Sequence, residues 1–577
     1  MKKWWKDFRK FSEDRLYMLV LALVAVCAYG FMVTHPAVGI DDTPYQYYFE
    51  EGLAAIVGRW VMFLLNKLLH VADFAPFLTD FIGVLILMAA VTVWAVLFRN
   101  LFEPEYVGSS RFVSSVPRYG YLFFAAIFIS CPLISEVYTY YLHNGIATGY
   151  LSCGISLCCF REGMLRLDAQ PAGRGLKGIR HAAGAFLGSV IGMWIAMGCY
   201  ESFMIVWLQG ICLMLLTERF AGVRRKVFRV LCIAAGVAVL GMVFRSVMIQ
   251  LVTAVFGLEY LKDEAVQRSV TEMVAWMLQP GAMSDLSMVL KRMFVMYGVF
   301  AYAYYPIRIF VLALAVIVVF SVWRAIRGKD VWTFLLMLAA LAVPLLLAVI
   351  EGKATYYRSA QFLPPVCAYG ALLVVYGMEN ISVVLQGRWE RKNGLRAVRG
   401  IVSALLCVVL WNQCTDMNKW FYVDVQKYEA AKDYVGQIAY ELEKHFDTDK
   451  PVVFTGSYEV PESIIGDAYV PIGSETFFKM KRITDMVDEH LLEKFYRTYG
   501  VWVAQTPALS VIEWGRNAFD TDEELVRFFA MHGYELVPMQ EEAVYAEAEL
   551  YSYEMDLPEF PGEGSIVDMG DYIIVHL

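Results

Sequence analysis

Two adjacent carboxylates, Asp41 and Asp42, follow the first long apolar block of the chain. One such carboxylate can accept a proton from an attacking hydroxyl group. The other can orient that base, or hold a divalent cation such as Mg²⁺ or Mn²⁺ beside a phosphate leaving group. Alternatively, the stretch Asp-Asp-Thr-Pro is a loop turn in which an aspartate caps a short helix. The dipeptide alone favours the turn and does not say which aspartate would act as the base.

Basic and aromatic side chains gather in the short segment 351–361, between two apolar blocks. A lipid phosphate at a membrane edge needs cationic donors, which Lys353 and Arg358 can supply, the arginine in bidentate form. Tyr356 and Tyr357 can stack on a sugar ring, or anchor the chain at the membrane interface. A second segment of this kind contains Tyr304, Tyr305 and Arg308.

Two glutamates, Glu136 and Glu201, lie where apolar blocks end. An ionisable group near a membrane interior is costly, so each is a candidate for function. Alternatively, each side chain reaches the outer water within one helical turn. His143 is a lone histidine in an aromatic turn, and we expect it to be structural rather than a metal ligand.

The elements that carry these residues are strongly apolar. Of 577 residues, 58% are hydrophobic and 18% are charged, and the mean hydropathy is +0.50. This balance excludes a disordered chain, a small disulfide scaffold and a simple soluble enzyme. The apolar residues form blocks long enough to cross a hydrocarbon core of about 30 Å. The sequence therefore predicts a polytopic membrane protein.

Eleven spans can be identified, and the basic residues between them alternate. The segments on the side of the N-terminus hold 27 Lys and Arg, and the opposite loops hold 8. Because cytoplasmic loops collect basic residues, this predicts a cytoplasmic N-terminus and an extracytoplasmic tail. The first block is read as a retained anchor rather than a cleaved signal peptide. The spans are residues 16–34, 77–98, 120–137, 145–160, 183–200, 202–217, 230–252, 306–323, 332–350, 362–384 and 400–414.

Two of the outer segments contain further apolar residues. Val61–Leu69 is too short to span and is predicted to form an interfacial helix. Residues 253–305 mix apolar and charged side chains at helical spacing, which suggests helices on the outer surface, or a stretch that re-enters the membrane.

The tail has a different composition from the body. After Cys414 there are 12 Lys and Arg against 32 Asp and Glu, a balance of −20, whereas residues 1–414 carry +12. Strand signals at 452–456 and 573–577, with an amphipathic helix at 523–532, indicate an α/β fold. We therefore predict an α-helical membrane body, residues 1–414, and an extracytoplasmic soluble α/β domain, residues 415–577.

Several other classes of site are absent from the sequence. It contains no GxxxxGK[ST], GxGxxG or HExxH motif, and neither half has the basic face that nucleic-acid binding requires. All eleven cysteines lie at or before Cys414, without the paired spacing of a zinc site, so we expect them to be free and to pack as small apolar side chains.

The stretch from Gly39 to Thr43, Gly-Ile-Asp-Asp-Thr, together with Gly58-Arg59-Trp60, resembles the glucosyltransferase GtrII family. The likeness extends to the multi-span layout and to an outside helix after the last span. That helix carries Asp416, Asn418, Tyr422, Asp424, Tyr428 and Asp433. The likeness to the family also extends to the end of the chain, at Pro558–Pro561, Gly564–Ile566 and Tyr572–Val575.

The resemblance implies a membrane glycosyltransferase of the GT-C type, associated with modification of O-antigen and other surface glycans of bacteria. Such enzymes use a polyprenyl-phosphate sugar and act on the outer face of the cell membrane. An acidic residue in their first outer loop is essential, and by position this role falls on Asp41 or Asp42. Similar basic residues in the corresponding loop support a phosphate-binding role for Arg358.

We therefore expect inverting transfer of a hexose, glucose by the resemblance, from a lipid-linked donor to a surface-glycan acceptor. A divalent cation is optional. The alternatives are a lipid-sugar flippase or transporter, in which Glu136, Glu201 and Arg245 form a relay, and a glycan polymerase or ligase. The expected donor-phosphate ligands are Arg358, Lys353 and Arg308. The expected substrate-binding residues are Arg59, Glu136, Tyr138, His143, Asn144, Glu201, Tyr304, Tyr356 and Tyr357.

Overall fold

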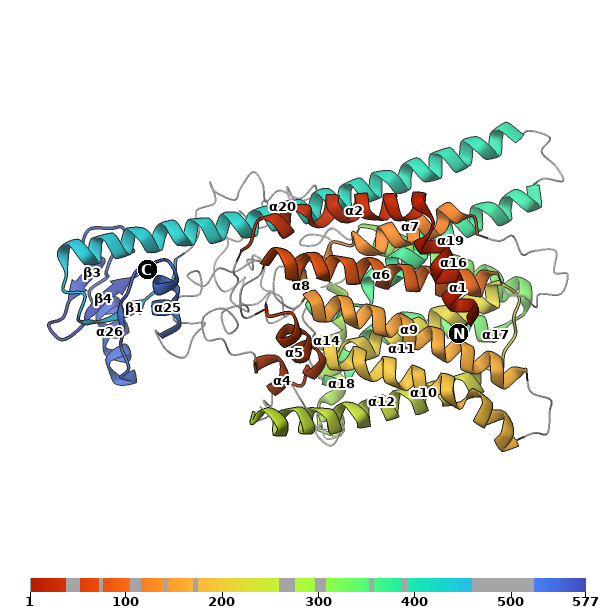
Figure 1. Ribbon diagram of the computed structural model, residues 1–577, viewed down its shortest axis with the longest axis horizontal. Helices are drawn as coiled ribbons and strands as arrows, with labels where there is room; N and C mark the ends of the chain where they lie inside the picture. The colour runs from red at the N-terminus through yellow and green to blue at the C-terminus, as the bar shows by residue number, and fades with distance from the viewer. Residues whose placement is uncertain are drawn as a thin grey trace.

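The computed structural model is mostly helical, and its helices form an elongated bundle with a small sheet at one end (Figure 1). It describes residues 2–37, 52–71, 76–103, 116–138, 143–169, 175–258, 276–295, 308–351, 357–385, 392–458 and 523–577.

The first half of the bundle comprises α1 (Lys2–Ser12), α2 (Arg15–Thr34), α4 (Leu53–Ile56), α5 (Trp60–Leu68), α6 (Pro76–Phe102), α7 (Arg118–Ile129), α8 (Leu133–Tyr138), α9 (His143–Asp168), α10 (Gly175–Cys199) and α11 (Phe203–Phe220). The second half comprises α12 (Val227–Phe256), α14 (Ala282–Val295), α16 (Arg308–Gly328), α17 (Val331–Ala342), η4 (Val343–Leu345), α18 (Leu346–Glu351), η5 (Tyr357–Ser359), α19 (Leu363–Leu385) and α20 (Lys392–His445).

Within the described residues, eight helices are long and apolar enough to cross a membrane. They lie in α2, α6, α10, α11, α12, α16, the segment Val331–Ile350, and α20. This agrees with the prediction of a helical membrane protein, while the count of eleven spans stays a prediction.

The three expected spans that do not meet this criterion coincide with helices inside the bundle. Residues 120–137 form two shorter helices, α7 and α8, separated at Ser130–Pro132. The helix α9 is rich in Gly, Ser and Cys and packs against α6, α10 and α11. Small residues allow helices to approach closely, and a helix enclosed by others needs less apolar surface than one that faces lipid. This explains why α9 is less apolar than the long helices of the bundle that it packs against.

Charged side chains lie at both ends of the bundle. At one end, here called the inner end, Arg219 pairs with Asp330 at 3.0 Å, and Arg225 pairs with Glu218 at 2.8 Å and with Asp168. All of these residues come from segments predicted to be cytoplasmic. At the opposite, outer end, Arg59 approaches Glu201 and Asp80 approaches His143. Segments predicted to share a side of the membrane therefore meet in space.

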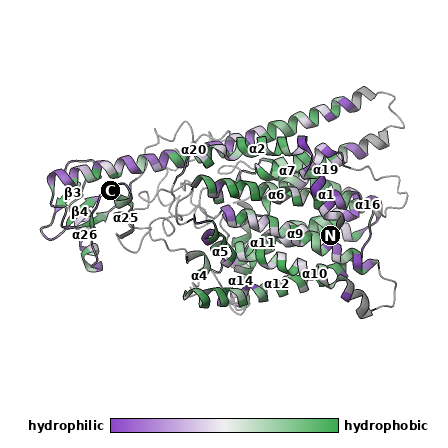
Figure 2. Cartoon of the chain, viewed as in Figure 1, coloured by the Kyte–Doolittle hydropathy of each residue, from purple (hydrophilic) through white to green (hydrophobic). Residues whose placement is uncertain are grey.

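The 54-residue helix α20 joins the bundle to the C-terminal sheet (Figure 1). Its first half lies along α2, where the Asn418 side chain donates a hydrogen bond to the Cys27 carbonyl. Figure 2 shows that α20 becomes more hydrophilic toward the sheet. The predicted boundary between residues 414 and 415 falls inside this continuous helix and stays a prediction.

The sheet has four strands in the order β2-β1-β4-β3. β1 (Pro451–Thr455) pairs in parallel with β2 (Val537–Pro538) and β4 (Ile573–His576), and β3 (Ile566–Asp568) is antiparallel to β4. The end of α20 and α25 (Glu523–Met531) share one core with the sheet, and α26 (Glu542–Glu554) packs against β1 in another. The strands and helix predicted at 452–456, 523–532 and 573–577 are present.

Candidate functional site

A tight turn between α4 and α5 positions Arg59 at the outer end of the bundle. Gly58 has a φ of +84°, a conformation that side chains with a Cβ rarely adopt. The amide of Arg59 donates a hydrogen bond to the Ala54 carbonyl at 2.7 Å, which closes the turn. The sequence Gly58-Arg59-Trp60 therefore fixes the arginine at the start of α5.

The helix α5 packs directly on the end of α10. A Cβ added at Gly198 would lie 2.5 Å from Nε1 of Trp60, so only glycine permits this contact. The Trp60 ring also lies 5.1 Å from that of Trp194, between centroids. The segment predicted as an interfacial helix is thus helical, with one face buried against the bundle, and it brings Arg59 to the junction of α10 and α11.

At this junction Arg59 meets a carboxylate and an aromatic ring. Its Nη2 lies 3.4 Å from Oε1 of Glu201, and its guanidinium lies over the Tyr200 ring, 4.2 Å from the centroid. From α12, Arg245 donates hydrogen bonds to the carbonyls of Met197, at 3.2 Å, and Gly58, at 3.3 Å. Arg245 therefore ties the α4–α5 turn to the end of α10.

The electrostatics of this cluster favour full ionisation. Burial by itself raises the pKa of Glu201, but the charges of Arg59 and Arg245 outweigh burial, so the pKa of Glu201 lies below its ordinary value. Burial lowers the pKa of Arg59, and Glu201 more than offsets that effect, so the pKa of Arg59 is raised. A third cation, Arg358, is close enough to act on both Arg59 and Tyr200. Arg59 and Arg245 therefore act on the Glu201 carboxylate, and Arg358 acts on Arg59 beside it.

In the ion pair between Arg59 and Glu201, two buried atoms have unused hydrogen-bonding capacity. Among the described residues, neither Nε of Arg59 nor Oε2 of Glu201 has a hydrogen-bond partner. A buried polar group without a partner costs free energy, so this arrangement is suited to a polar ligand that would supply one.

The turn η5 holds Arg358 near the cluster. Nε2 of Gln361 donates to the Arg358 carbonyl at 2.7 Å, and the Tyr150 hydroxyl donates to Oε1 of Gln361 at 2.5 Å. Ser359, the next residue of η5, lies close enough to the Tyr200 hydroxyl to act on it. The segment after the ninth predicted span is thereby fixed to α9 and to the α10–α11 junction.

A second polar cluster lies at the outer ends of α6, α8 and α9. Oδ1 of Asp80 is 3.0 Å from Nε2 of His143, and the side-chain nitrogen of Asn144 is 3.1 Å from the same Nε2. The Tyr138 hydroxyl donates to the Gly83 carbonyl at 3.2 Å. A Cβ at Gly83 would lie 2.6 Å from the His143 ring, so this glycine makes room for the pair. His143, expected to be structural, thus has a carboxylate partner.

The structure brings together only some of the predicted site residues. Arg59, Glu201 and Arg358 share the first cluster, and Tyr138, His143 and Asn144 share the second. Glu136 lies on α8, and Arg308 and Tyr357 begin α16 and η5. Five predicted residues lie outside the described part of the chain: Asp41, Asp42, Tyr304, Lys353 and Tyr356.

Sequence reasoning missed Asp80 and Gln361, and considered Arg245 only for a transporter. Asp80 and Arg245 each interrupt an apolar block, and a charge at such a position is a signal for function. Gln361 offers no such signal, because its role depends on the approach of α9.

The predicted cation site remains a prediction. Within the described ranges, no group of three or more His, Cys, Asp or Glu side chains could hold a metal ion, and Asp41 and Asp42 lie outside those ranges. All eleven cysteines are free, and five are buried, three partly buried and three exposed.

Comparison with curated proteins gives no match, and comparison with solved structures gives none either. Residues 30–375 match the family described as glucosyl transferase GtrII. The predicted likeness of the later helix and of the chain's end lies beyond these residues and stays a prediction. Because the match covers more than half of the sequence, the chain belongs to the GtrII family of glucosyl transferases.

Proposed function

We propose that this membrane glucosyl transferase moves glucose from a polyprenyl-phosphate donor to a surface glycan on the outer face of the membrane. The observation that carries this proposal is that Arg59 and Arg245 act on the Glu201 carboxylate, with Arg358 close to Arg59, at the outer end of the bundle.

The charges of this cluster suit the phosphate of a lipid-linked sugar. Three guanidinium groups and one carboxylate leave a net charge of +2, so an anion is attracted and a cation repelled. Arginine presents planar donors that match phosphate oxygens. Glu201 holds Arg59 in place by an ion pair until the phosphate arrives. The position between helix ends would let the lipid tail remain among the spans.

In the proposed reaction, Asp41 or Asp42 takes the proton from an acceptor hydroxyl. The resulting oxygen attacks the anomeric carbon with inversion as the bond between that carbon and the phosphate oxygen breaks. Polyprenyl phosphate departs with the bonding electron pair, and the arginines stabilise the negative charge that develops on it. Tyr138, His143 and Asn144 are proposed to contact the sugar from the neighbouring cluster.

Incubation of the purified full-length protein with polyprenyl-phosphate glucose labelled in the sugar tests this proposal. Appearance of single labelled glucose residues on the surface glycan supports it. Transfer of whole chains would instead indicate a polymerase or ligase. Movement of donor across vesicle membranes without turnover would indicate a flippase. Either of these results would overturn the proposal.

A further inference from the structure

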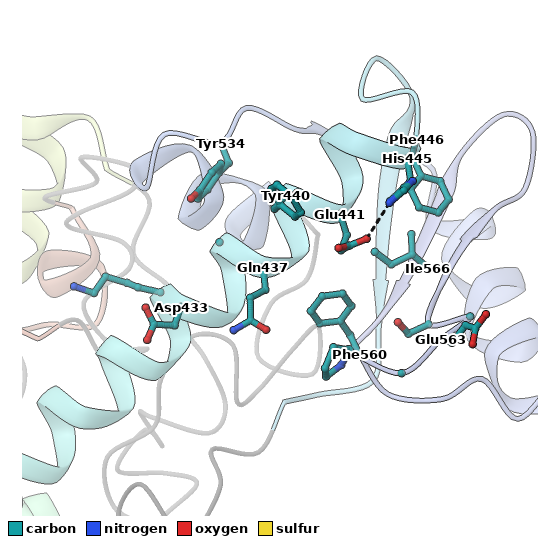
Figure 3. Close-up of a pocket in the computed structure, with 16 residues that line it drawn as sticks. Asp433, Gln437, Tyr440, Glu441, His445, Phe446, Tyr534, Phe560, Glu563 and Ile566 are labelled. Atoms are coloured by element: carbon teal, nitrogen blue, oxygen red, sulfur yellow. Dashed lines mark ion pairs between the residues drawn. The ribbon is translucent and has the colours of Figure 1, made fainter.

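The C-terminal part of the chain contains a cavity of about 800 Å³ that the proposed chemistry does not use (Figure 3). This volume lies within the range of about 300–1,000 Å³ that is typical of ligand pockets. One wall is a stripe of α20, and the facing wall is the loop that leads into β3.

The stripe on α20 follows helical spacing. Asp433, Gln437, Tyr440 and Glu441 lie on it, and Figure 3 shows Gln437 pointing toward the Phe560 ring of the opposite loop. Residues three, four or eight positions apart share one helix face, so the stripe presents its acidic, amide and aromatic groups together.

The loop wall is held rigidly by its backbone. The amide of Phe560 donates to the His576 carbonyl at 2.9 Å, and the amide of His576 donates to the Ser565 carbonyl at 2.9 Å. The Tyr434 hydroxyl, on α20, donates to the Phe560 carbonyl at 3.0 Å. Both walls are therefore formed before any ligand binds, which lowers the entropic cost of binding.

The charges of the cavity favour a neutral ligand rich in hydroxyl groups. Asp433, Glu441 and Glu563 supply carboxylates, which accept hydrogen bonds, and Glu441 also lies 3.5 Å from Nε2 of His445 in the same wall. Among the described residues of the wall the one lysine is Lys432, which pairs with Glu429 at 2.7 Å, outside the cavity. A phosphate would therefore be repelled, whereas sugar hydroxyls would donate to the carboxylates and sugar rings would stack on the aromatic faces.

The cavity lies well beyond the end of α2 along α20. The rings of Phe31 and Tyr422 lie 5.9 Å apart and mark where α20 passes the end of α2. Gln437 follows fifteen residues later, which corresponds to about 22 Å of helix. A ligand that occupies this cavity while another part of it reacts at the bundle must be a long one.

From these observations we infer that the cavity binds a distant segment of the acceptor glycan, as an uncharged oligosaccharide stretch. The identity of the glycan in this inference rests on the proposed function. The binding itself rests on the shape and charges of the cavity. It assigns to Tyr440 and Gln437 the recognition of an acceptor chain rather than a part in the chemistry.

Equilibrium binding to the full-length protein in detergent tests this inference. The probe is the neutral oligosaccharide mixture obtained by mild acid cleavage of the host cell's surface polysaccharide, followed by saturation-transfer NMR. Wild-type protein is expected to bind it, and Tyr440→Ala and Gln437→Ala are each expected to weaken binding about tenfold. Tyr440 is 57% exposed, so its loss should leave the fold intact.

The matched control is Tyr553→Ala, because Tyr553 lies on α26, is 86% exposed and does not line the cavity. Equal binding by wild type, Tyr440→Ala and Gln437→Ala would overturn the inference, as would absence of binding by wild type or equal loss in Tyr553→Ala. Stronger binding of a phosphorylated oligosaccharide would contradict the charge argument. Transfer without binding would refute this inference alone, and cavity-dependent binding without transfer would refute the proposed function alone.

Discussion

At the residue scale, the cluster around Glu201 shows how much a local sequence can indicate. Glu201 and Arg358 follow from residue type and position at the ends of apolar blocks, and Arg59 follows from the Gly58-Arg59-Trp60 motif of the family resemblance. Their meeting could not be predicted, because it depends on the turn at Gly58 and on η5, which bring together segments that are far apart in sequence. Asp41 and Asp42 lie outside the described residues, so their role stays a prediction.

Replacement of Arg59 tests its proposed role in binding phosphate. Hydrogen bonds to charged groups contribute about 1.5–3 kcal/mol, so Arg59→Ala should weaken binding of polyprenyl phosphate by about 10- to 100-fold. The control is Arg9→Ala, because Arg9 pairs with Glu13 on an exposed face of α1. Titration of both proteins with polyprenyl phosphate measures the effect, and equal affinities would exclude a role for Arg59.

The low pKa of Glu201 leads to a prediction about pH. A carboxyl group whose pKa is lower in the folded than in the unfolded protein stabilises the fold at pH values above its unfolded pKa, which is 4.5 for glutamate. This contribution is lost as the pH falls through the folded pKa. Wild type should therefore be more stable than Glu201→Gln by about 1–3 kcal/mol near neutral pH. Thermal denaturation across acidic pH should show this difference shrinking, and a constant difference would contradict the argument.

At the element scale, close packing of α5 on α10 positions the cluster. A Cβ at Gly198 would collide with Trp60, whereas at Gly184, on the same helix, nothing lies within 4 Å. Overpacking of this kind costs about 1–3 kcal/mol, so Gly198→Ala should lower both stability and sugar transfer, while Gly184→Ala should lower neither. Thermal stability and transfer rate measured for both variants check this prediction. Identical behaviour of the two variants would mean that the contact does not matter.

The elements themselves were largely predictable from the sequence. The helix at residues 61–69 and the strands and helix of the tail follow from periodicity. The division of residues 120–137 into α7 and α8 was missed, although Pro132, in the middle of the apolar block, is a signal for a break in the helix. The burial of α5 against α10 also escaped prediction, since an amphipathic helix gives the same pattern whether it faces a membrane surface or protein.

At the scale of the whole molecule, the charge pattern separates two ends of the bundle. Ion pairs such as Arg219–Asp330 link segments predicted to be cytoplasmic, and Arg59–Glu201 links segments predicted to be outside. The same pattern predicts the orientation of both termini. In cells with permeable outer layers and an intact inner membrane, a C-terminal tag should be cleaved by added protease and an N-terminal tag should be protected. The reverse pattern would place the acidic tail in the cytoplasm and contradict the topology.

The most direct test of the central claim is a single-turnover measurement of glucose transfer from polyprenyl-phosphate glucose. Wild-type protein, Arg59→Ala and Arg358→Ala are compared at saturating acceptor. If the arginines stabilise the departing phosphate, wild type transfers one glucose with inversion, and each variant is slower by about 10²–10³-fold. Wild-type rates in both variants, or release of no polyprenyl phosphate by wild type, would contradict the account.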